Sequence, residues 1–218
     1  MIQFQLKFNT LSTDRVLRVL VACEYSATVR DAFAARGHDA WSCDLLPCDK
    51  GGQHIQGNVL DVLDQGWDLM IAHPPCTYLA NSGARWLWED KSRGMKNKER
   101  WLQLEQAATF FRAFIDADIP RICIENPIML SYGLKAVGRR YDQKIQPYQF
   151  GHKETKATCL WLKGLDPLQP TTDYKEETMA LPAKIRCRLG YLSPSPDRWK
   201  LRSKTYDGIA QAMAQQWG

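Results

Sequence analysis

Residues 16–23 have the sequence VLRVLVAC, and this run decides the expected fold. Its density of valine and leucine is typical of a strand that is buried on both faces of a parallel sheet. Residues 27–36 follow as an amphipathic segment, which predicts a helix ending before Gly37. A buried strand followed directly by a helix is the first unit of an α/β pattern.

The same alternation continues along the chain and predicts one domain, spanning 1–218, with a doubly wound, mainly parallel sheet. In such sheets ligands bind beyond the carboxyl ends of the strands, and the polar motifs of this chain fall at those ends. After about Tyr141 the pattern becomes less regular. The further expected strands are 38–43, 67–72, 121–124, 143–150 and 158–162, the further helices are 97–117 and 209–217, and 164–183 is a loop-rich excursion.

The composition is that of an ordinary globular protein, with 44% hydrophobic and 24% charged residues among 218. No apolar run is long enough to cross a bilayer, and residues 1–15 lack the continuous apolar stretch of a signal peptide, so no membrane association or export is expected. Seven scattered cysteines without paired spacings favour a reducing compartment, which points to the cytoplasm. The spacing of His38, Cys43 and Cys48 matches no zinc site, so no metal is expected.

The strand at 67–72 runs directly into His73-Pro74-Pro75-Cys76. Two prolines stiffen the backbone and fix the next side chain, a thiol, at the mouth of the strand. A thiolate is a strong nucleophile when nearby positive charge lowers its pKa, and Arg85, Lys91 and Arg93 follow closely in the sequence. Most free cysteines are small buried hydrophobic residues, so Cys76 alone does not establish a nucleophile.

A second motif, Glu125-Asn126-Pro127, follows the next expected strand, so a carboxyl group and the Cys76 thiol should face the same crevice. This pair suits covalent attack on an electron-poor ring whose nitrogen is protonated at the same time, and cytosine is such a ring. The alternative for Glu125 is a charge that stabilises the start of a helix.

Together these two motifs resemble those of the DNA cytosine-C5 methyltransferases, in the short form common in phage and prophage genomes. Pro74-Pro75-Cys76 is similar to the nucleophile motif, and Glu125-Asn126-Pro127 to a Glu-Asn-Val motif. The resemblance spans about Arg18 to Gly218 and implies a Rossmann-like class I methyltransferase fold. It also implies methyl transfer from S-adenosylmethionine to cytosine C5 in DNA, with Cys76 as nucleophile and Glu125 as acid.

The resemblance also implies a set of cofactor-binding residues. The turn after the first strand has small residues where the family has glycines, Asp44 resembles the acid that binds ribose hydroxyls, and Asn58 occupies the place of the residue that binds the adenine amino group. A diverged final motif follows at 202–209. The full set implied for S-adenosylmethionine is Cys23, Glu24, Tyr25, Ser26, Ala27, Asp44, Asn58, Val59, Pro74, Thr205 and Tyr206.

Positive charge gathers in two segments that favour contact with DNA. Residues 85–100 carry six basic against three acidic residues, with Trp86 and Trp88 among them, and residues 184–204 carry seven basic against one acidic. The family's Gln-x-Arg-x-Arg motif has no clean copy, and only the excursion around 164–195 has room for target recognition. The candidate DNA-binding residues are Arg85, Lys153, Lys156, Arg198, Lys200 and Arg202.

Other functions remain open at this stage, and the sequence does not indicate an oligomeric state. An enzyme of the same fold could modify a free nucleotide or an RNA base, and a catalytically silent homologue could bind nucleic acid only. A dinucleotide-dependent oxidoreductase is disfavoured because no GxGxxG follows the first strand.

Overall fold

The computed structural model describes residues 15–218, and the expectation that no signal peptide is present concerns residues that lie almost wholly outside this range. Seven strands form the main sheet, in the order β3-β2-β1-β4-β7-β9-β8, and only β9 runs against the others. The predicted doubly wound, mainly parallel, Rossmann-like sheet is confirmed. The strands are β1 (Arg18–Ala22), β2 (Asp39–Asp44), β3 (His54–Gln56), β4 (Leu69–Ala72), β7 (Arg121–Pro127), β8 (Gln143–Ile145) and β9 (Thr158–Lys163).

The order of the strands departs in one respect from that of dinucleotide-binding sheets. The first five parallel strands match the 3-2-1-4-5 part of the Rossmann order, but β9 is inserted antiparallel between the fifth and the sixth. Its pairing explains why β7 is longer than predicted: Glu125 pairs with Leu160, and Pro127 with Thr158. The Glu125-Asn126-Pro127 motif therefore lies on the last residues of a strand, where its side chains are fixed by the sheet.

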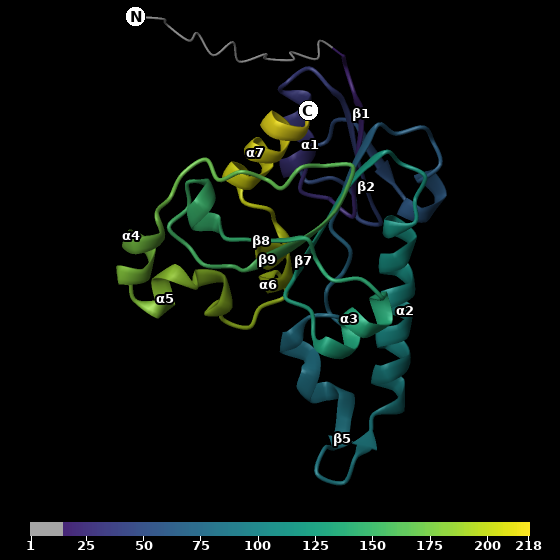
Figure 1. Cartoon of the computed structure of the whole chain (residues 1–218), viewed down its shortest axis with the longest axis vertical. Coiled ribbons are helices and arrows are strands. Elements are labelled where there is room, and N and C mark those ends of the chain that lie inside the picture. Colours follow the sequence, from purple (N-terminus) through teal and green to yellow (C-terminus); the bar gives the residue numbers. More distant parts are fainter. Residues whose placement is uncertain (1–14) are drawn as a thin grey trace, which may run out of the picture.

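Helices cover both faces of the sheet (Figure 1). On one face α1 and α7 pack together, and on the other lie the long helix α2 and the short helix α3. The small helices α4, α5 and α6 belong to the region after β9. The bounds are α1 (Thr28–Ala34), α2 (Lys98–Ile115), α3 (Ser131–Val137), α4 (Lys175–Ala180), α5 (Ala183–Arg186), α6 (Arg198–Ser203) and α7 (Asp207–Trp217), with 3-10 turns η1 (Val59–Val62), η2 (Asn81–Leu87), η3 (Pro147–Phe150) and η4 (Arg188–Gly190).

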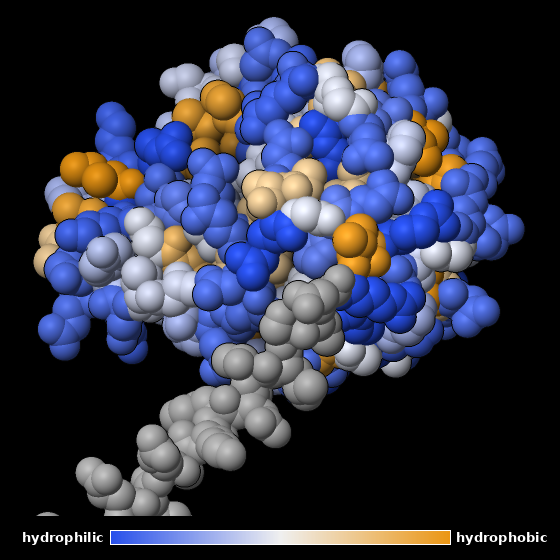
Figure 2. All heavy atoms as spheres, turned by 90° about the horizontal axis from the view of Figure 1, so that it is seen from above, coloured by the Kyte–Doolittle hydropathy of each residue, from blue (hydrophilic) through white to orange (hydrophobic). Residues whose placement is uncertain are grey.

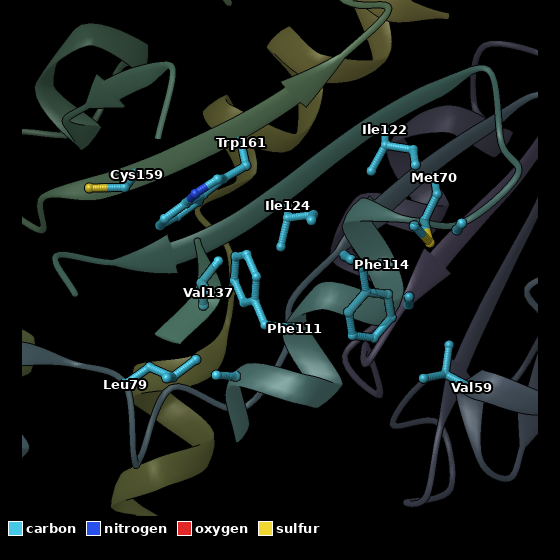
Figure 3. Packing of buried hydrophobic residues seen from close by; sticks show 14 of the residues in the cluster. Val59, Met70, Leu79, Phe111, Phe114, Ile122, Ile124, Val137, Cys159 and Trp161 are labelled. Atoms are coloured by element: carbon cyan, nitrogen blue, oxygen red, sulfur yellow. The ribbon is translucent and has the colours of Figure 1, made fainter. Parts of the chain in front are cut away.

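The core is divided between the two faces by the alternation of side chains along β1. Leu20 joins the cluster under α2, whereas Val19 and Val21 join the cluster under α1 and α7. Figure 3 shows Phe111 of α2 packed toward Trp161 of β9, and their ring centroids are 5.0 Å apart. The strand predicted to be buried on both faces is thus confirmed, with Val19–Ala22 fully buried.

Some boundaries and elements differ from those expected. The strand predicted at 143–150 stops at Ile145, because Pro147 opens the turn η3. The hairpin of β5 (Trp88–Asp90) and β6 (Met95–Lys96) was not predicted, and it projects beside the start of α2 at the bottom of Figure 1.

Figure 2 faces the end of the molecule where the chain enters β1. The described part of this face is largely hydrophilic, and its apolar side chains lie in separate small groups. An extended apolar binding surface is not visible on the part of this end that the structure describes. Nor does any helix within 15–218 have both the length and the apolar character needed to cross a membrane.

Candidate active site

A cavity of about 940 Å³ lies at the carboxyl ends of the central strands. The segments after β1 and β4 and the last residues of β7 line it, together with the start of α2 and the segment 187–205. This is the crevice where doubly wound sheets bind their ligands. The structure brings together in this one cavity the predicted site residues Cys23, Glu24, Tyr25, Ser26, Pro74, Cys76, Glu125, Lys156, Arg202 and Thr205.

Cys76 is held by three contacts around the proline segment. The side-chain amide of Asn126 donates a 3.0 Å hydrogen bond to the carbonyl of Pro74, two residues before the thiol. After the thiol, the carbonyl of Cys76 accepts a 2.8 Å hydrogen bond from the amide of Ala80, and Arg100 of α2 donates a 2.7 Å bond to the carbonyl of Thr77. The half-buried Cys76 is therefore fixed both to β7 and to α2.

Glu125 lies beside a histidine that the sequence analysis did not assign to the site. The Nδ1 atom of His73 is 3.3 Å from Oε2 of Glu125, and the Glu125 side chain is 15% exposed. Burial acts to raise the pKa of Glu125, but the hydrogen bond from His73 and the positive charge of Lys156 outweigh burial and lower it. Glu125 is therefore a carboxylate in the free protein at neutral pH.

The expected lowering of the Cys76 pKa is wrong. Burial raises the pKa of this thiol above its ordinary value, and the negative charge of Glu125 raises it further. The cations that oppose this are Lys156 and Arg202, which come from distant parts of the chain, whereas Arg85, Lys91 and Arg93 were the expected ones. The free protein thus has a neutral thiol next to an ionised carboxylate.

The turn after β1 has the backbone of a glycine-rich turn without its glycines. Cys23 and Ala27 both have φ near 59°, and they are the non-glycine residues with positive φ within 15–218. This left-handed conformation is disfavoured for residues with a Cβ atom, and such strain tends to persist at functional sites. Ala27 is buried and caps α1, so it shapes the turn rather than lining the cavity.

Glu24, which is buried within the same turn, occupies the start of α1. Its carboxylate accepts hydrogen bonds of 2.8 Å from the amide of Val29 and 3.1 Å from that of Arg30. In dinucleotide-binding folds these helix amides bind the pyrophosphate. Because the Glu24 carboxylate already accepts the hydrogen bonds of these amides, they are not free to bind a phosphate, and its negative charge repels one.

Three further predicted cofactor residues lie outside the lining of the cavity. Asp44 is the last residue of β2, and its Oδ1 atom accepts a 2.9 Å hydrogen bond from the amide of Leu46. It lies close enough to Cys23 that its negative charge, after burial, helps to raise the pKa of that thiol. Asn58 caps η1 by accepting from the amide of Leu60, and Val59 is buried in the core. Their role in cofactor binding stays a prediction.

The segment 187–205 covers one side of the cavity and is fastened by side chains from elsewhere. The hydroxyl of Tyr25 donates a 3.1 Å bond to the carbonyl of Lys200, and the ammonium group of Lys156 donates one of 3.0 Å to that of Arg202. Lys204 pairs with Asp49 at 3.0 Å. The segment that contains α6 therefore contacts both the turn after β1, through Tyr25, and the side of the cavity near Cys76, through Lys156.

The remaining predicted residues lie around the cavity rather than in its lining. Tyr206, whose hydroxyl donates a 2.8 Å bond to Glu154, has a pKa raised by burial and by this bond. Arg85 is exposed and stacks on Trp86, with its guanidinium carbon 4.4 Å from the ring centre. Exposed Lys153 lies near the ring of Tyr174, and half-buried Arg198 and Lys200 belong to α6.

Within the described residues 15–218, no three His, Cys, Asp or Glu side chains are grouped as a metal site would require. His38 packs near Phe33, Cys43 is buried in the core, and Cys48 lies beside Arg30. The residues that the sequence analysis missed are His73, Arg100, Trp199 and the amide of Asn126. The first of these had a visible signal, a histidine between a buried strand and two prolines.

Comparison with known proteins gives matches among solved structures only. No family model matches the sequence, and no curated protein matches it. Among solved structures, the chain is similar to a protein from E. coli that is provisionally described as a DNA modification methyltransferase encoded within a prophage. The two share 15% identity with a TM-score of 0.45, and the match covers 72% of this chain and 51% of the other, so the chain spans about half the length of that structure.

Proposed function

We propose that this chain is an S-adenosylmethionine-dependent methyltransferase that methylates C5 of cytosine in DNA through a covalent bond from Cys76. The observation that supports it is the presence of Cys76 and Glu125 in one cavity at the ends of β4 and β7. A fixed thiol and a fixed carboxyl group are the two groups that addition to a pyrimidine ring requires.

The ionisation of the two groups defines the first chemical step. The sulfur of Cys76 bonds to C6, its S–H bond breaks, the electrons of the C5=C6 bond move to C5, and N3 gains a proton. Because Glu125 is ionised and the thiol is neutral in the free protein, this step moves one proton from sulfur toward N3. A base that enters the cavity excludes water from Glu125, which raises its pKa and readies it to carry that proton.

The second step consumes the electron pair that has reached C5. C5 bonds to the transferred methyl group, the C5 proton is then lost and the C5=C6 bond re-forms. As the Cys76 sulfur leaves, N3 gives up the proton that it had gained and the sulfur regains one. The proton lost from C5 is the one that appears in solution over the whole reaction. The residues of this chain hold the ring and the sulfur in place through both steps.

The residues near β1 fit a cofactor that carries no phosphate. Glu24 disfavours a phosphate at the start of α1, whereas a sulfonium is positively charged. Tyr25, Ser26 and Thr205 line the cavity and would hold the cofactor. Asp44, which ends β2 outside this lining, is the residue proposed for its ribose hydroxyls. When bound, S-adenosylmethionine supplies the methyl group.

DNA as the partner is supported by the cations and aromatic rings at the mouth of the cavity. Trp86 is 55% exposed, lines the cavity and carries the Arg85 guanidinium on its ring. Lys156 and Arg202 add positive charge beside Cys76. An enzyme that extrudes a base needs phosphate contacts and flat side chains near the vacated stack.

A free nucleotide or an RNA base is the second candidate substrate. It is favoured by the small excursion around 164–195, of which only Cys187, Leu189 and Gly190 line the cavity. The same chemistry at Cys76 would serve both substrates. The two differ in the size of the substrate that the cavity accepts, so methylation of a duplex and of a mononucleotide must be compared directly.

Covalent trapping on 5-fluorocytosine tests the proposal, because fluorine at C5 blocks the final elimination. In the presence of S-adenosylmethionine, a duplex that carries this base should form an adduct that maps to the Cys76 peptide by mass spectrometry. Cys76→Ser should abolish the adduct, and Glu125→Gln should slow its formation by roughly two to four orders of magnitude. Cys48→Ser, away from the cavity, is the matched control and should leave it unchanged.

An active Cys76→Ser protein, or an adduct on another cysteine, would contradict the C5 mechanism. Calorimetry with S-adenosylmethionine distinguishes a silent nucleic-acid-binding homologue, which would give no cofactor binding. Trapping of a 5-fluorocytosine mononucleotide but not of the duplex would favour the second candidate.

A further inference from the structure

The hairpin of β5 and β6, residues 88–96, projects from the body of the molecule beside the start of α2 (Figure 1). It connects two segments that line the cavity, since Trp86 lies just before it and Asn97 just after it. The proposed chemistry at Cys76 uses none of its side chains. Its exposed non-glycine residues are Glu89, Lys91, Ser92, Arg93, Met95 and Lys96.

The base of the hairpin is fixed to α2 and α3. Trp88 packs edge-on against Trp101 of α2 and Tyr132 of α3, with ring centroids 5.9 and 6.4 Å away. The carbonyl of buried Leu87 accepts hydrogen bonds of 3.0 Å from the amide of Asn97 and 2.9 Å from the indole of Trp101. A ribbon anchored in this way presents its outer residues in a defined orientation, which recognition of a ligand requires.

The tip of the hairpin is ordered by its own side chains. One oxygen of the Asp90 carboxylate accepts hydrogen bonds of 3.0 and 2.6 Å from the amide and hydroxyl of Ser92, and the other lies 3.4 Å from Nε of Arg93. Between Trp88 and Asp90 the pairing with β6 shifts by one residue, so Glu89 is the extra residue of a β-bulge. A hydrogen-bond acceptor, Glu89, and a donor, Arg93, are therefore both exposed on a short ordered ribbon.

We propose that this hairpin enters the major groove of duplex DNA and reads bases beside the target cytosine. The major groove is about 12 Å wide and admits a two-stranded ribbon, whereas the minor groove is about 6 Å wide. The charge of the surroundings suits phosphates, because residues 85–100 carry six basic against three acidic residues. Arginine can pair with guanine, and a carboxylate can accept a bond from the amino group of cytosine. The inference rests on the proposed function for its substrate, duplex DNA.

The excursion around 164–195, the other candidate for target recognition, has less freedom to enter a groove. The amide of Thr155 donates a 2.6 Å bond to the carbonyl of Arg186, and the amide of Tyr174 donates one of 3.1 Å to that of Tyr148. Both bonds tie the excursion to the segment between β8 and β9. The hairpin is thus the better candidate for the part of the chain that reads the target sequence.

The length of the hairpin predicts where the bases that it reads lie. Lys91, near the tip, is five residues from Trp86 in the cavity wall, and five residues span at most about 17 Å. Base pairs are stacked about 3.4 Å apart along the duplex, so the tip reaches no further than about five base pairs from the site beside Trp86. Because a single hairpin extends from the cavity wall, these bases should lie on one side of the target cytosine.

Selection from a random duplex library tests the inference through binding alone, without methyl transfer. The unmodified protein should enrich a short motif within about five base pairs of a cytosine. Arg93→Lys keeps the charge but loses the planar pair of donors that guanine recognition uses, so the preference at one position should fall roughly 10- to 100-fold. Glu89→Gln should change the preference at a second position. Both side chains are exposed, so the variants should fold, which circular dichroism checks.

Lys184→Ala is the matched control, because it removes an exposed cation from the excursion and should leave the motif unchanged. A motif that is the same in Arg93→Lys and Glu89→Gln as in the unmodified protein overturns the inference. It is also overturned if the unmodified protein enriches no sequence, or if only Lys184→Ala changes the motif, which would assign recognition to the excursion.

The outcome for the hairpin is separate from the outcome for the proposed function. A motif that changes in either hairpin variant supports the inference even if no methylated nucleoside is ever found, because that failure concerns methyl transfer alone. Conversely, methylation of cytosine by hairpin variants that keep the original motif supports the proposed function and overturns recognition by the hairpin.

Discussion

The single hydrogen bond between Asn126 and the carbonyl of Pro74 should govern both the stability of the site and the placement of Cys76. Asn126 is 1% exposed, and Nδ2 is its bonded atom, while Oδ1 has no partner among the described residues. Asn126→Ala leaves the buried carbonyl of Pro74 unpaired, which costs about 1 to 3 kcal/mol, and removes an oxygen whose burial was itself unfavourable. We expect a net loss of about 2 kcal/mol.

For a domain of this size, 2 kcal/mol corresponds to a fall in Tm of about 4 to 8 °C, measurable by calorimetry. The larger effect should be on catalysis, since a thiol displaced by about 1 Å costs on the order of 100-fold in rate. Asn126→Asp has the same shape but places an oxygen 3.0 Å from the carbonyl and a charge beside Glu125. It should therefore lose more stability than Asn126→Ala.

Gln143→Ala is the matched control, because the Gln143 side chain makes two bonds to the backbone of Leu168 outside the cavity. It should lose comparable stability and retain the methyl-transfer rate of the folded protein, measured well below Tm. If Asn126→Ala changes the free energy of unfolding by less than about 0.5 kcal/mol, or slows transfer no more than Gln143→Ala does, the bond to Pro74 does not position the thiol.

Three other properties can be tested independently. Thr178 is buried and its hydroxyl has no partner among the described residues, so Thr178→Val should raise the free energy of unfolding by about 1 kcal/mol, and a lower Tm would contradict this. Burial, followed by nearby acidic charge, raises the pKa of Cys43 from 9.0 to about 11. The folded state thus binds this proton more tightly than the unfolded state, and stability should fall by up to about 3 kcal/mol as the pH rises from 9 to 11. Cys43→Ser should flatten that fall in a denaturation series, and an equally steep fall would assign it to other groups. Tyr25→Phe removes the bond to the carbonyl of Lys200, so proteolysis within α6 should become faster, and an unchanged cleavage rate would show that other contacts fasten α6.

The sequence predicted those features that depend on local periodicity. The apolar runs that form β1 and β4 are buried on both faces, and a strand of this kind has few alternatives in an α/β chain. Because parallel strands end at the same edge of the sheet, Cys76 and Glu125 could be expected to meet without knowledge of any contact. The prolines around each motif made the prediction stronger, since they limit the backbone to few conformations.

Features that depend on pairing between distant segments could not be predicted in this way. The cations near Cys76 are Lys156 and Arg202, and nothing in the sequence spacing shows that their segments return to β4. The pKa of the thiol was expected to fall because charge was counted along the chain, whereas burial and Glu125 decide it in space. His73 likewise joins the site through its contact with Glu125, which is 52 residues away in the sequence.

The distribution of charge within the cavity favours one combination of ligands over others. Near β1 the fixed charge is the Glu24 carboxylate, bound to the amides of α1. Near Cys76 the two positive charges of Lys156 and Arg202 outnumber the Glu125 carboxylate. A cavity divided in this way stabilises a cation at the first end and a polyanion at the second. A cofactor with phosphates would meet Glu24, because the amides that could bind a phosphate are already taken. This arrangement of charge therefore supports the proposed pair of ligands, in which a positively charged methyl donor binds at the β1 end and a nucleic acid strand binds at the Cys76 end. The strained turn of Cys23 and Ala27 lies on the side where the donor would bind.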